Sequence, residues 1–341
     1  MSLFLLERHS EITDYFTHTT PSRFALQFVS DFKPSANMGE VLFTSGKMSV
    51  RDVWMMSKLN KANRGINDML EKYEFGVAQQ AGYALWINDI CDVYLELVKP
   101  VVYDTEEANK DKRWAAQACL WNALETGLRL LHPMMPYVTE ELWQRLPGRG
   151  TLGAEEKQSI MLAKYPEGNS KYENLEVEGA MEGVLEVVKA FRSLKTQYNI
   201  KNADKPKCFI KCTDAKEFAG IEKQCDDIET LGKVSAKMVE KGVVVSESCS
   251  VVIVSSSISV YMDLEGVVDY SKEVQKLTKE SKKVAFSLLE SEKKISADGY
   301  AERVPKDVQK KNQEEKQAAE NKLAELKAAI AKFEKLAAAK K

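Results

Sequence analysis

The C-terminal segment of the chain carries residues on a row with alternating steps of four and three. The row consists of Tyr270, Val274, Leu277, Ser281, Val284, Leu288, Ser291 and Ile295, so two serines interrupt an apolar seam. A seam with this period predicts a helix that packs along another helix. A second seam follows a turn at Asp298-Gly299 and Pro305, and it consists of Leu323, Leu326, Ile330, Phe333 and Ala337. Two similar seams joined by a short turn predict an antiparallel coiled-coil hairpin, roughly 40 Å long.

The charge of this segment differs from that of the remainder. Residues 270–341 contain 18 Lys and Arg against 12 Asp and Glu, a balance of +6. The whole chain has a formal charge of −2, so the other residues carry −8. A basic tail on an acidic body suggests a polyanionic partner for the tail. A solvated helix face is the plainer explanation, and charge alone favours it.

Two further blocks precede this segment. The first runs to about residue 204, and the 3.6-residue periodicity of its apolar residues predicts a helical bundle. One of its helices is expected to stop before Pro100, because proline cannot donate a backbone hydrogen bond. The second block, about 205–269, contains the β-rich runs KCFIKC, SVVIVS and ISVYMDL around a polar helix, which predicts a small α+β unit. The fold class is therefore mainly α.

Composition favours a cytoplasmic protein. No apolar run approaches the roughly 20 residues that cross a membrane, and the N-terminus lacks signal-peptide features. The six cysteines show no C-x-x-C spacing, and Cys208 and Cys212 have no histidine nearby. We therefore expect reduced thiols, no zinc and no other metal site.

The residues offer no catalytic constellation. The chain has three histidines, and no P-loop, G-x-G-x-x-G, G-x-S-x-G or H-E-x-x-H motif occurs in it. His132 follows an apolar helix and precedes Pro133, in the stretch LLHPMMPYVTEELWQRLP. We interpret this histidine as structural, because a helix C-terminus favours it there. The nearby Met134, Met135, Tyr137 and Trp143 are interpreted as packing residues.

Several stretches, in order along the chain, resemble the C-terminal part of valyl-tRNA synthetase of the eukaryotic cytosolic type. They are RFAL with DFKPS, CDVYLELVKP, LETGLRLLHPMMPYVTEELWQRLP, SIMLAKYPE, AFRSLKTQYNI and YMDLEGVVD. The resemblance covers about residues 23–336. Residues 1–22 resemble nothing recognised in the family. The tripeptide Lys47-Met48-Ser49 resembles the start of the family's ATP-binding KMSKS loop, but Val50-Arg51 follow it, and we interpret it as a linker.

The resemblance implies an arrangement of domains. Residues 23–204 would be the helical anticodon-binding domain of class I aminoacyl-tRNA synthetases, 205–269 the small α+β unit, and 270–341 a coiled-coil tRNA-binding arm. In the family, the catalytic core, which uses ATP and Mg, and the editing domain lie upstream. Neither is present in this chain, so the resemblance implies valine–tRNA ligase ancestry without catalytic residues or a cofactor here.

The implied function is tRNA binding, with a valine tRNA as the expected partner and other translation proteins as further candidates. RNA is held by Lys and Arg at its phosphates and by stacking on aromatic rings. In the bundle the candidate residues are Lys58, Lys61, Arg64, Arg192, Lys195 and Tyr198. In the hairpin they are Lys276, Lys279, Lys282, Lys283, Lys293, Lys294, Lys310 and Lys311. The alternative function is a coiled-coil protein-interaction scaffold derived from a synthetase fragment.

The missing motifs generate a prediction. Because these 341 residues contain no nucleotide-binding motif, we predict no valine-dependent exchange of pyrophosphate into ATP by this chain. The measurement is radiolabelled pyrophosphate exchange at saturating valine and ATP. Exchange above a heat-inactivated control would contradict the prediction.

Overall fold

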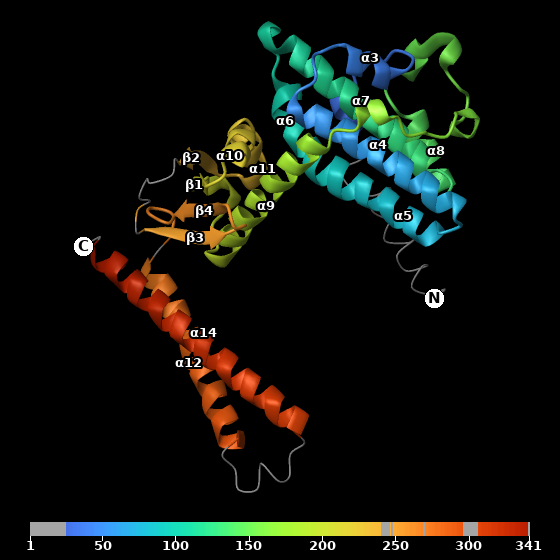
Figure 1. The fold of residues 1–341 in the computed structure, drawn as a ribbon. Helices are drawn as coiled ribbons and strands as arrows, with labels where there is room; N and C mark the ends of the chain where they lie inside the picture. The colour runs from blue at the N-terminus through green and yellow to red at the C-terminus, as the bar shows by residue number, and fades with distance from the viewer. Residues whose placement is uncertain (1–24, 240–245, 247, 269, 296–305, 340–341) are drawn as a thin grey trace. The chain divides into compact units, whose positions relative to one another are not determined.

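The computed structural model describes residues 25–239, 246, 248–268, 270–295 and 306–339 (Figure 1). The chain divides into two compact units. The first comprises Met1–Val188 and Asp214–Lys233, and the second comprises Lys189–Thr213 and Val234–Lys341. Residues 1–22, for which no resemblance was found, lie outside the described residues. The domain boundaries inferred from the sequence stay a prediction.

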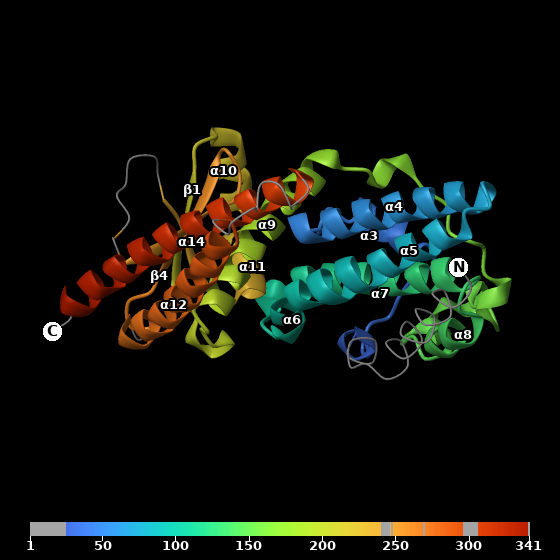
Figure 2. The same ribbon diagram turned by 90° about the horizontal axis from the view of Figure 1, so that it is seen from below.

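The first unit is a helical bundle. Its helices are α3 (Met38–Thr44), α4 (Val50–Glu71), α5 (Phe75–Ala84), α6 (Leu95–Tyr103), α7 (Lys110–Leu131), α8 (Pro136–Gln144), the first part of α9 (Leu175–Gln197), α10 (Ala215–Glu222) and α11 (Cys225–Gly232). Helices α4, α5 and α7 pack side by side (Figures 1 and 2). They bury the apolar faces that the periodicity predicted, including Trp54, Ile66, Leu120 and Leu128. The prediction of a mainly helical fold is confirmed.

Between α5 and α6 the chain forms a π-helix, η1 (Leu85–Tyr94). A π-helix bonds residue i to residue i+5, so residues five apart fall on a similar side. Leu85 and Ile90, five apart, are both buried. The longer turn therefore keeps the apolar residues of this segment in the core.

The prediction that this helical segment ends before Pro100 is wrong. Helix α6 continues to Tyr103 and contains Pro100. Proline removes one backbone hydrogen bond from a helix interior. The cost is tolerated here because only three residues of α6 follow Pro100.

The connection from α8 to α9 is built from short turns. They are the 3₁₀ helices η3 (Arg149–Glu155), η4 (Ile160–Leu162) and η5 (Ser170–Tyr172), and a further 3₁₀ turn, η2 (Glu107–Asn109), precedes α7. Gly148 starts this connection in the left-handed region, at φ 77°. Its backbone lies against Phe32 and Pro34, which brings the connection close to the start of the bundle.

The second unit contains a four-stranded sheet. Its strands are β1 (Lys207–Cys212), β2 (Ser235–Val239), β3 (Cys249–Ile253) and β4 (Ile258–Asp263), in the order β2-β1-β4-β3. The β1–β2 pair is parallel, and the other two pairs are antiparallel. Alternate residues of the central strands are buried, among them Cys208, Ile210, Val260 and Met262. The predicted small sheet is present, and β2 is a strand that the sequence did not reveal. Helices α10 and α11, which the prediction placed with the strands, group with the first unit. A 3₁₀ turn, η6 (Asn202–Asp204), precedes β1.

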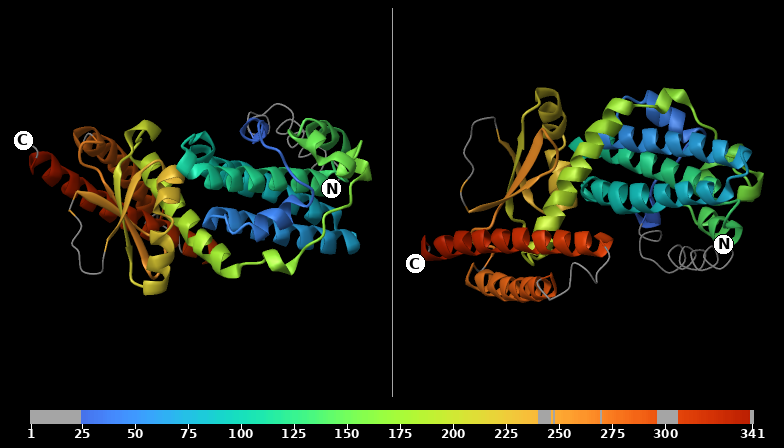
Figure 3. Two further views of the ribbon diagram at one scale, coloured as in Figure 1. Left: turned by 90° about the horizontal axis from the view of Figure 1, so that it is seen from above. Right: turned by 60° about the horizontal axis from the view of Figure 1, so that its bottom comes forward.

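The unit also contains two long helices, α12 (Tyr270–Ile295) and α14 (Lys306–Ala339), which lie side by side (Figure 3). Tyr270, at the start of α12, packs against Phe333 near the end of α14, with ring centroids 6.0 Å apart. The two helices are therefore antiparallel. The seam residues of α12 are buried or half-buried, whereas Phe286 and Leu289, which lie off the seam, are exposed.

Part of the hairpin prediction stays untested. The turn at Asp298-Gly299 and Pro305 lies outside the described residues, and supercoiling of the two helices stays a prediction. No helix in the described part of the chain is long and apolar enough to cross a membrane.

The contacts of Gly148 give a test of the bundle. A Cβ atom at this position would lie 2.4 Å from Pro34 Cδ and 2.5 Å from the Phe32 carbonyl oxygen. We expect Gly148→Ala to lower the free energy of unfolding by about 2–4 kcal/mol, from the clash and the left-handed backbone together. Urea unfolding followed by circular dichroism measures this loss.

Gly150 supplies the matched control for this substitution. It belongs to the same connection, and a Cβ atom there would meet nothing within 4 Å. Gly150→Ala should change the free energy of unfolding by less than about 1 kcal/mol. Equal losses in the two variants would show that the close approach at Gly148 is not required.

Candidate nucleic-acid interface

Three cations predicted to contact RNA stand about one turn apart on α4. Each pairs with a carboxylate from another part of the first unit. The pairs, with their N···O distances, are Lys58–Asp89 (3.3 Å), Lys61–Glu178 (3.2 Å) and Arg64–Glu173 (2.9 Å). The charge on this side of α4 is therefore largely balanced, although the side chains of Lys61 and Arg64 stay exposed at the surface of the bundle.

Two of these carboxylates are themselves held in place by the fold. Glu178 of α9 is buried and accepts a hydrogen bond from the Ser57 hydroxyl at 2.6 Å. Burial raises the pKa of Asp89, and the ammonium of Lys58 opposes this rise. Lys58 and Lys61 therefore have a structural task, which is to compensate carboxylates that link α4 to η1 and α9.

The other three candidates of the bundle prediction lie in the last part of α9 or directly after it, in the second unit. Arg192 is exposed, whereas only 4% of Lys195 is accessible. The Tyr198 hydroxyl lies 3.0 Å from the Ser250 hydroxyl, and its ring packs edge-on against Phe333. Burial raises the pKa of Tyr198. Lys195 and Tyr198 thus contribute to the interior of the second unit.

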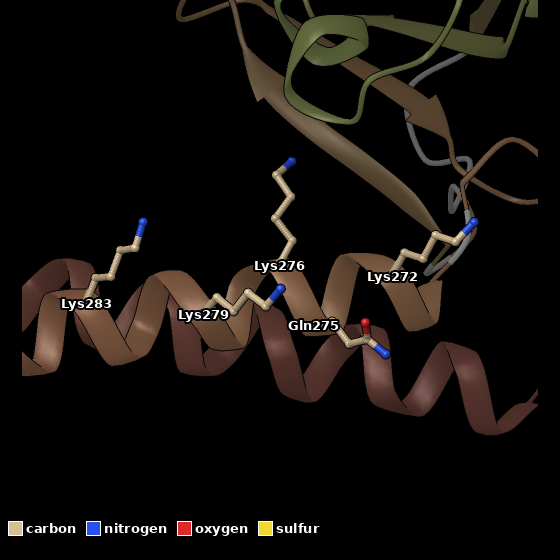
Figure 4. A pocket seen from close by; sticks show the side chains of 5 residues that line it. All are labelled: Lys272, Gln275, Lys276, Lys279 and Lys283. Atoms are coloured by element: carbon tan, nitrogen blue, oxygen red, sulfur yellow. The ribbon is translucent and has the colours of Figure 1, made fainter.

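The lysines of α12 have different surroundings. Lys272, Lys276, Lys279 and Lys283 line a groove of about 600 Å³ together with Gln275. Figure 4 shows the side chains of Lys272, Lys276 and Lys283 projecting from the same side of α12. The spacing of the four lysines is four, three and four, which repeats the seam with an offset of two residues. A lysine row thus follows the outside of the helix while the seam follows the inside.

Lys276 is tied to the fold by two contacts. Lys276 Nζ donates to the Gln197 carbonyl at 2.9 Å and lies 3.2 Å from a carboxylate oxygen of Glu273. Within the part of the chain that the structure describes, Lys279, Lys282 and Lys283 are exposed and have no ion-pair partner. Lys293 is also exposed. The side chains of Lys294, Lys310 and Lys311 lie outside the described residues.

Lys272 and Gln275, which also line the groove, were not among the residues predicted from the sequence. Continuing the heptad outward would have found them, because they occupy positions f and b when Tyr270 is position d. The analysis also missed two exposed apolar residues of the same outer face, Phe286 and Leu289. The sequence indicates them, because they are large apolar residues at outer heptad positions, away from the seam.

An exposed aromatic pair in the first unit was also missed. Tyr73, which is 80% exposed, meets Phe75 edge-on with ring centroids 6.1 Å apart. Tyr73 has φ 60° and follows α4, with its N–H donating to the Leu70 carbonyl and the next N–H to the Met69 carbonyl. This is the left-handed position of a Schellman motif, which glycine usually occupies. A tyrosine there costs about 1–2 kcal/mol.

Both ring nitrogens of His132 contact side chains of the bundle. Its Nδ1 atom lies 2.7 Å from the hydroxyl of the buried Thr139, and its Nε2 atom lies 2.8 Å from the Met161 sulfur. Burial lowers the pKa of His132, and the carboxylate of Glu140 opposes this effect. The neutral ring thus joins the end of α7 to α8 and the following connection.

Ser49 also has a structural role. Its N–H and hydroxyl donate to one carboxylate oxygen of Asp52, at 2.8 and 2.7 Å, at the start of α4. The Tyr94 hydroxyl donates to the other oxygen at 2.6 Å. Lys47 pairs with Asp111 at 2.8 Å. The tripeptide that resembles a nucleotide-binding loop therefore starts a helix.

Among the residues described, no group of three or more His, Cys, Asp and Glu side chains could hold a metal ion.

The sequence comparisons identify the class of the helical bundle. Residues 52–210 match the family described as "Anticodon-binding domain of tRNA ligase". This part of the chain is therefore a domain of that family.

Within that family the chain is similar to valine–tRNA ligases. It is 33% identical to the rat enzyme over 293 residues, 33% identical to that of Clostridium acetobutylicum over 260, and 35% identical to "Valine--tRNA ligase, mitochondrial 1" of Arabidopsis thaliana over 263. These matches cover 85%, 76% and 76% of this chain but 23%, 28% and 24% of the relatives. The chain thus spans about a quarter of their length.

The surroundings of His132 generate a stability prediction. We expect His132→Ala to lower the free energy of unfolding at pH 7.5 by about 1–3 kcal/mol, because Thr139 and Met161 lose their partner. The exposed neighbour Tyr137 gives the control, since Tyr137→Ala should change stability little.

The same histidine predicts a pH dependence. A pKa that is lower in the folded than in the unfolded protein means that the unfolded protein binds the proton first as pH falls. The stability that His132 contributes is therefore present above its unfolded pKa of about 6.5 and is lost as pH falls toward the folded value. Chemical unfolding at pH 7.5 and pH 5 should show a smaller decrease for His132→Ala than for the wild type. An equal decrease would mean that this ring does not titrate differently on folding.

Proposed function

We propose that this chain is a tRNA-binding part of a valine–tRNA ligase, and that the outer face of α12 holds phosphates of the tRNA. The observation that carries the proposal is the contrast between the two groups of cations. The α4 cations have carboxylate partners, whereas Lys279, Lys282 and Lys283 of α12 are exposed and have none among the described side chains.

The composition of the α12 face suits an RNA backbone. From Lys272 to Lys283, the outer heptad positions b, c and f hold five lysines and Gln275, with no carboxylate among them. This stretch is about 16 Å long, from 1.5 Å per residue, and therefore spans several phosphates. A polyanion gains free energy on such a face by releasing its counterions.

The bundle has a different part in the proposal. Its balanced charge leaves little attraction for phosphates in general, so it would contact the anticodon stem and loop at selected points. Tyr73 and Phe75 offer exposed rings, and unpaired RNA bases are recognised by stacking on such rings. A valine tRNA is the proposed partner because the relatives are valine–tRNA ligases. Other translation proteins are further candidates as partners.

We also place the protein in the cytoplasm. All six cysteines are free, and five of them are buried. Burial raises the pKa of Cys91 and Cys208 to about 12, which keeps these thiols protonated. Unpaired thiols suit a reducing compartment.

The proposal predicts a loss of salt-dependent tRNA affinity when exposed lysines of the outer face of α12 are neutralised. The variant Lys279→Gln, Lys282→Gln, Lys283→Gln removes three exposed ammonium groups. At low salt its affinity for tRNA should fall about ten- to a hundredfold, and the slope of log K against log salt should become shallower by about 2–3. Fluorescence anisotropy at several salt concentrations measures both quantities.

A matched variant separates position from net charge. Lys201, Lys205 and Lys207 are exposed and belong to the same unit, but they lie outside α12. Replacing these three with Gln changes the net charge equally and should leave the slope nearly unchanged. If both triple variants lose the same amount, or neither does, the α12 face is no specific RNA contact and the protein-interaction scaffold becomes the better explanation.

A further inference from the structure

The outer face of α12 changes character halfway along the helix. Its first half presents the lysine row, and its second half presents Phe286, Leu289 and Lys293 at outer heptad positions. Phe286 is 65% exposed and Leu289 is 55% exposed. Phe286 and Leu289 are three residues apart on the helix, so they form a small contiguous apolar patch on this face, and such a patch bordered by charged residues points to an interaction site.

The two apolar residues and the lysines form one continuous surface. Residues three or four apart on a helix are neighbours, so Lys282 and Lys283 lie one turn before Phe286, and Leu289 lies one turn after it. Lys293 is four residues beyond Leu289 and is exposed. Cations are therefore found within about one turn of the apolar pair on both sides.

This arrangement matches the chemistry of a nucleotide. A nucleotide combines a flat, weakly polar base with an anionic phosphate, and single-stranded nucleic acids are held by aromatic stacking together with basic groups. We propose that Phe286, supported by Leu289, stacks on a base of the bound RNA while the flanking lysines hold the neighbouring phosphates. The inference rests on the proposed function, because it assumes that RNA lies along α12.

The proposal limits the kind of RNA that fits. A ring can stack only on a base whose face is accessible, and bases within a continuous duplex have both faces covered by their neighbours. The partner of Phe286 is therefore an unpaired base that lies outside a stack. A folded tRNA supplies such bases in its loops, whereas all bases of an uninterrupted blunt-ended duplex are paired.

The first experiment compares two RNAs with full-length protein. For Phe286→Ser, the affinity for tRNA should fall about tenfold, while the affinity for a blunt-ended RNA duplex of similar length should fall less than twofold. The slope of log K against log salt should stay that of the wild type, because no cation has been removed. In the lysine triple variant, by contrast, the slope becomes shallower.

Substitutions at the same position separate stacking from simple apolar contact. Phe286→Trp should retain the affinity for tRNA, and Phe286→Leu should lose most of what Phe286→Ser loses. Ile253 of β3 gives the matched control, because it is 76% exposed and lies in the same unit outside α12. Ile253→Ser should not alter the affinity for either RNA. Circular dichroism melting checks that all variants are folded, as expected for exposed positions.

The outcomes distinguish this inference from the proposed function. If the wild type shows no salt-dependent tRNA affinity, the proposed function fails and the inference fails with it. If the lysine variant loses affinity but Phe286→Ser binds tRNA like the wild type, the function stands and the stacking contact is wrong. A loss shared equally by tRNA and duplex, or full affinity in Phe286→Leu, also overturns the stacking contact. The apolar pair would then be assigned to a protein partner.

Discussion

The packing of α12 against α14 decides which residues of this protein can meet a polyanion. The contact between Tyr270 and Phe333 fixes the rotation of α12 about its axis, with the seam inward. Because the seam faces α14, the heptad spacing alone puts Lys272, Lys279 and Lys283 on the opposite, exposed side of α12. The buried side of the helix therefore determines the exposed one, and a rotation of α12 equivalent to two residues, about 200°, would turn the lysine row toward α14.

In the first unit, by contrast, lysines of α4 are paired with carboxylates of the same fold. Glu178 is buried, and it would be costly there without Lys61 and the Ser57 hydroxyl. Asp89 likewise depends on Lys58. Cations that compensate carboxylates inside the fold are poor phosphate ligands, since moving to RNA would leave the carboxylate unpaired. In the bundle, Lys58 and Lys61 thus serve cohesion, and in the proposed complex its recognition of RNA would fall to the few aromatic rings that stay exposed.

The amino-acid sequence predicts the helices well and the roles of individual cations poorly. Apolar periodicity locates α4, α7 and the α12 seam because a repeated pattern outweighs any single residue. It does not show the carboxylates that face Lys58 and Lys61, since Asp89 and Glu178 are distant along the chain. Strand β2 was missed because its five residues, SAKMV, include Ser, Ala and Lys and only one β-branched residue, so they give a weak strand signal. The helix was expected to end at Pro100 because a local rule was applied without the tertiary packing that extends α6.

The two kinds of surface suggest how affinity and specificity are divided in the proposed complex. Phosphate contacts position an RNA without reading it, and base contacts supply the selection. A lysine row on α12 would attract any RNA, so on its own it would bind without discrimination. Phe286 on the same face adds a requirement for an accessible base, which separates a folded RNA with loops from a plain duplex. The bundle, with Tyr73 held at an energetic cost in the left-handed region, adds a second requirement of the same kind. Selection in this protein would then come from few aromatic contacts, each effective because the surrounding charge has already brought the RNA to the surface.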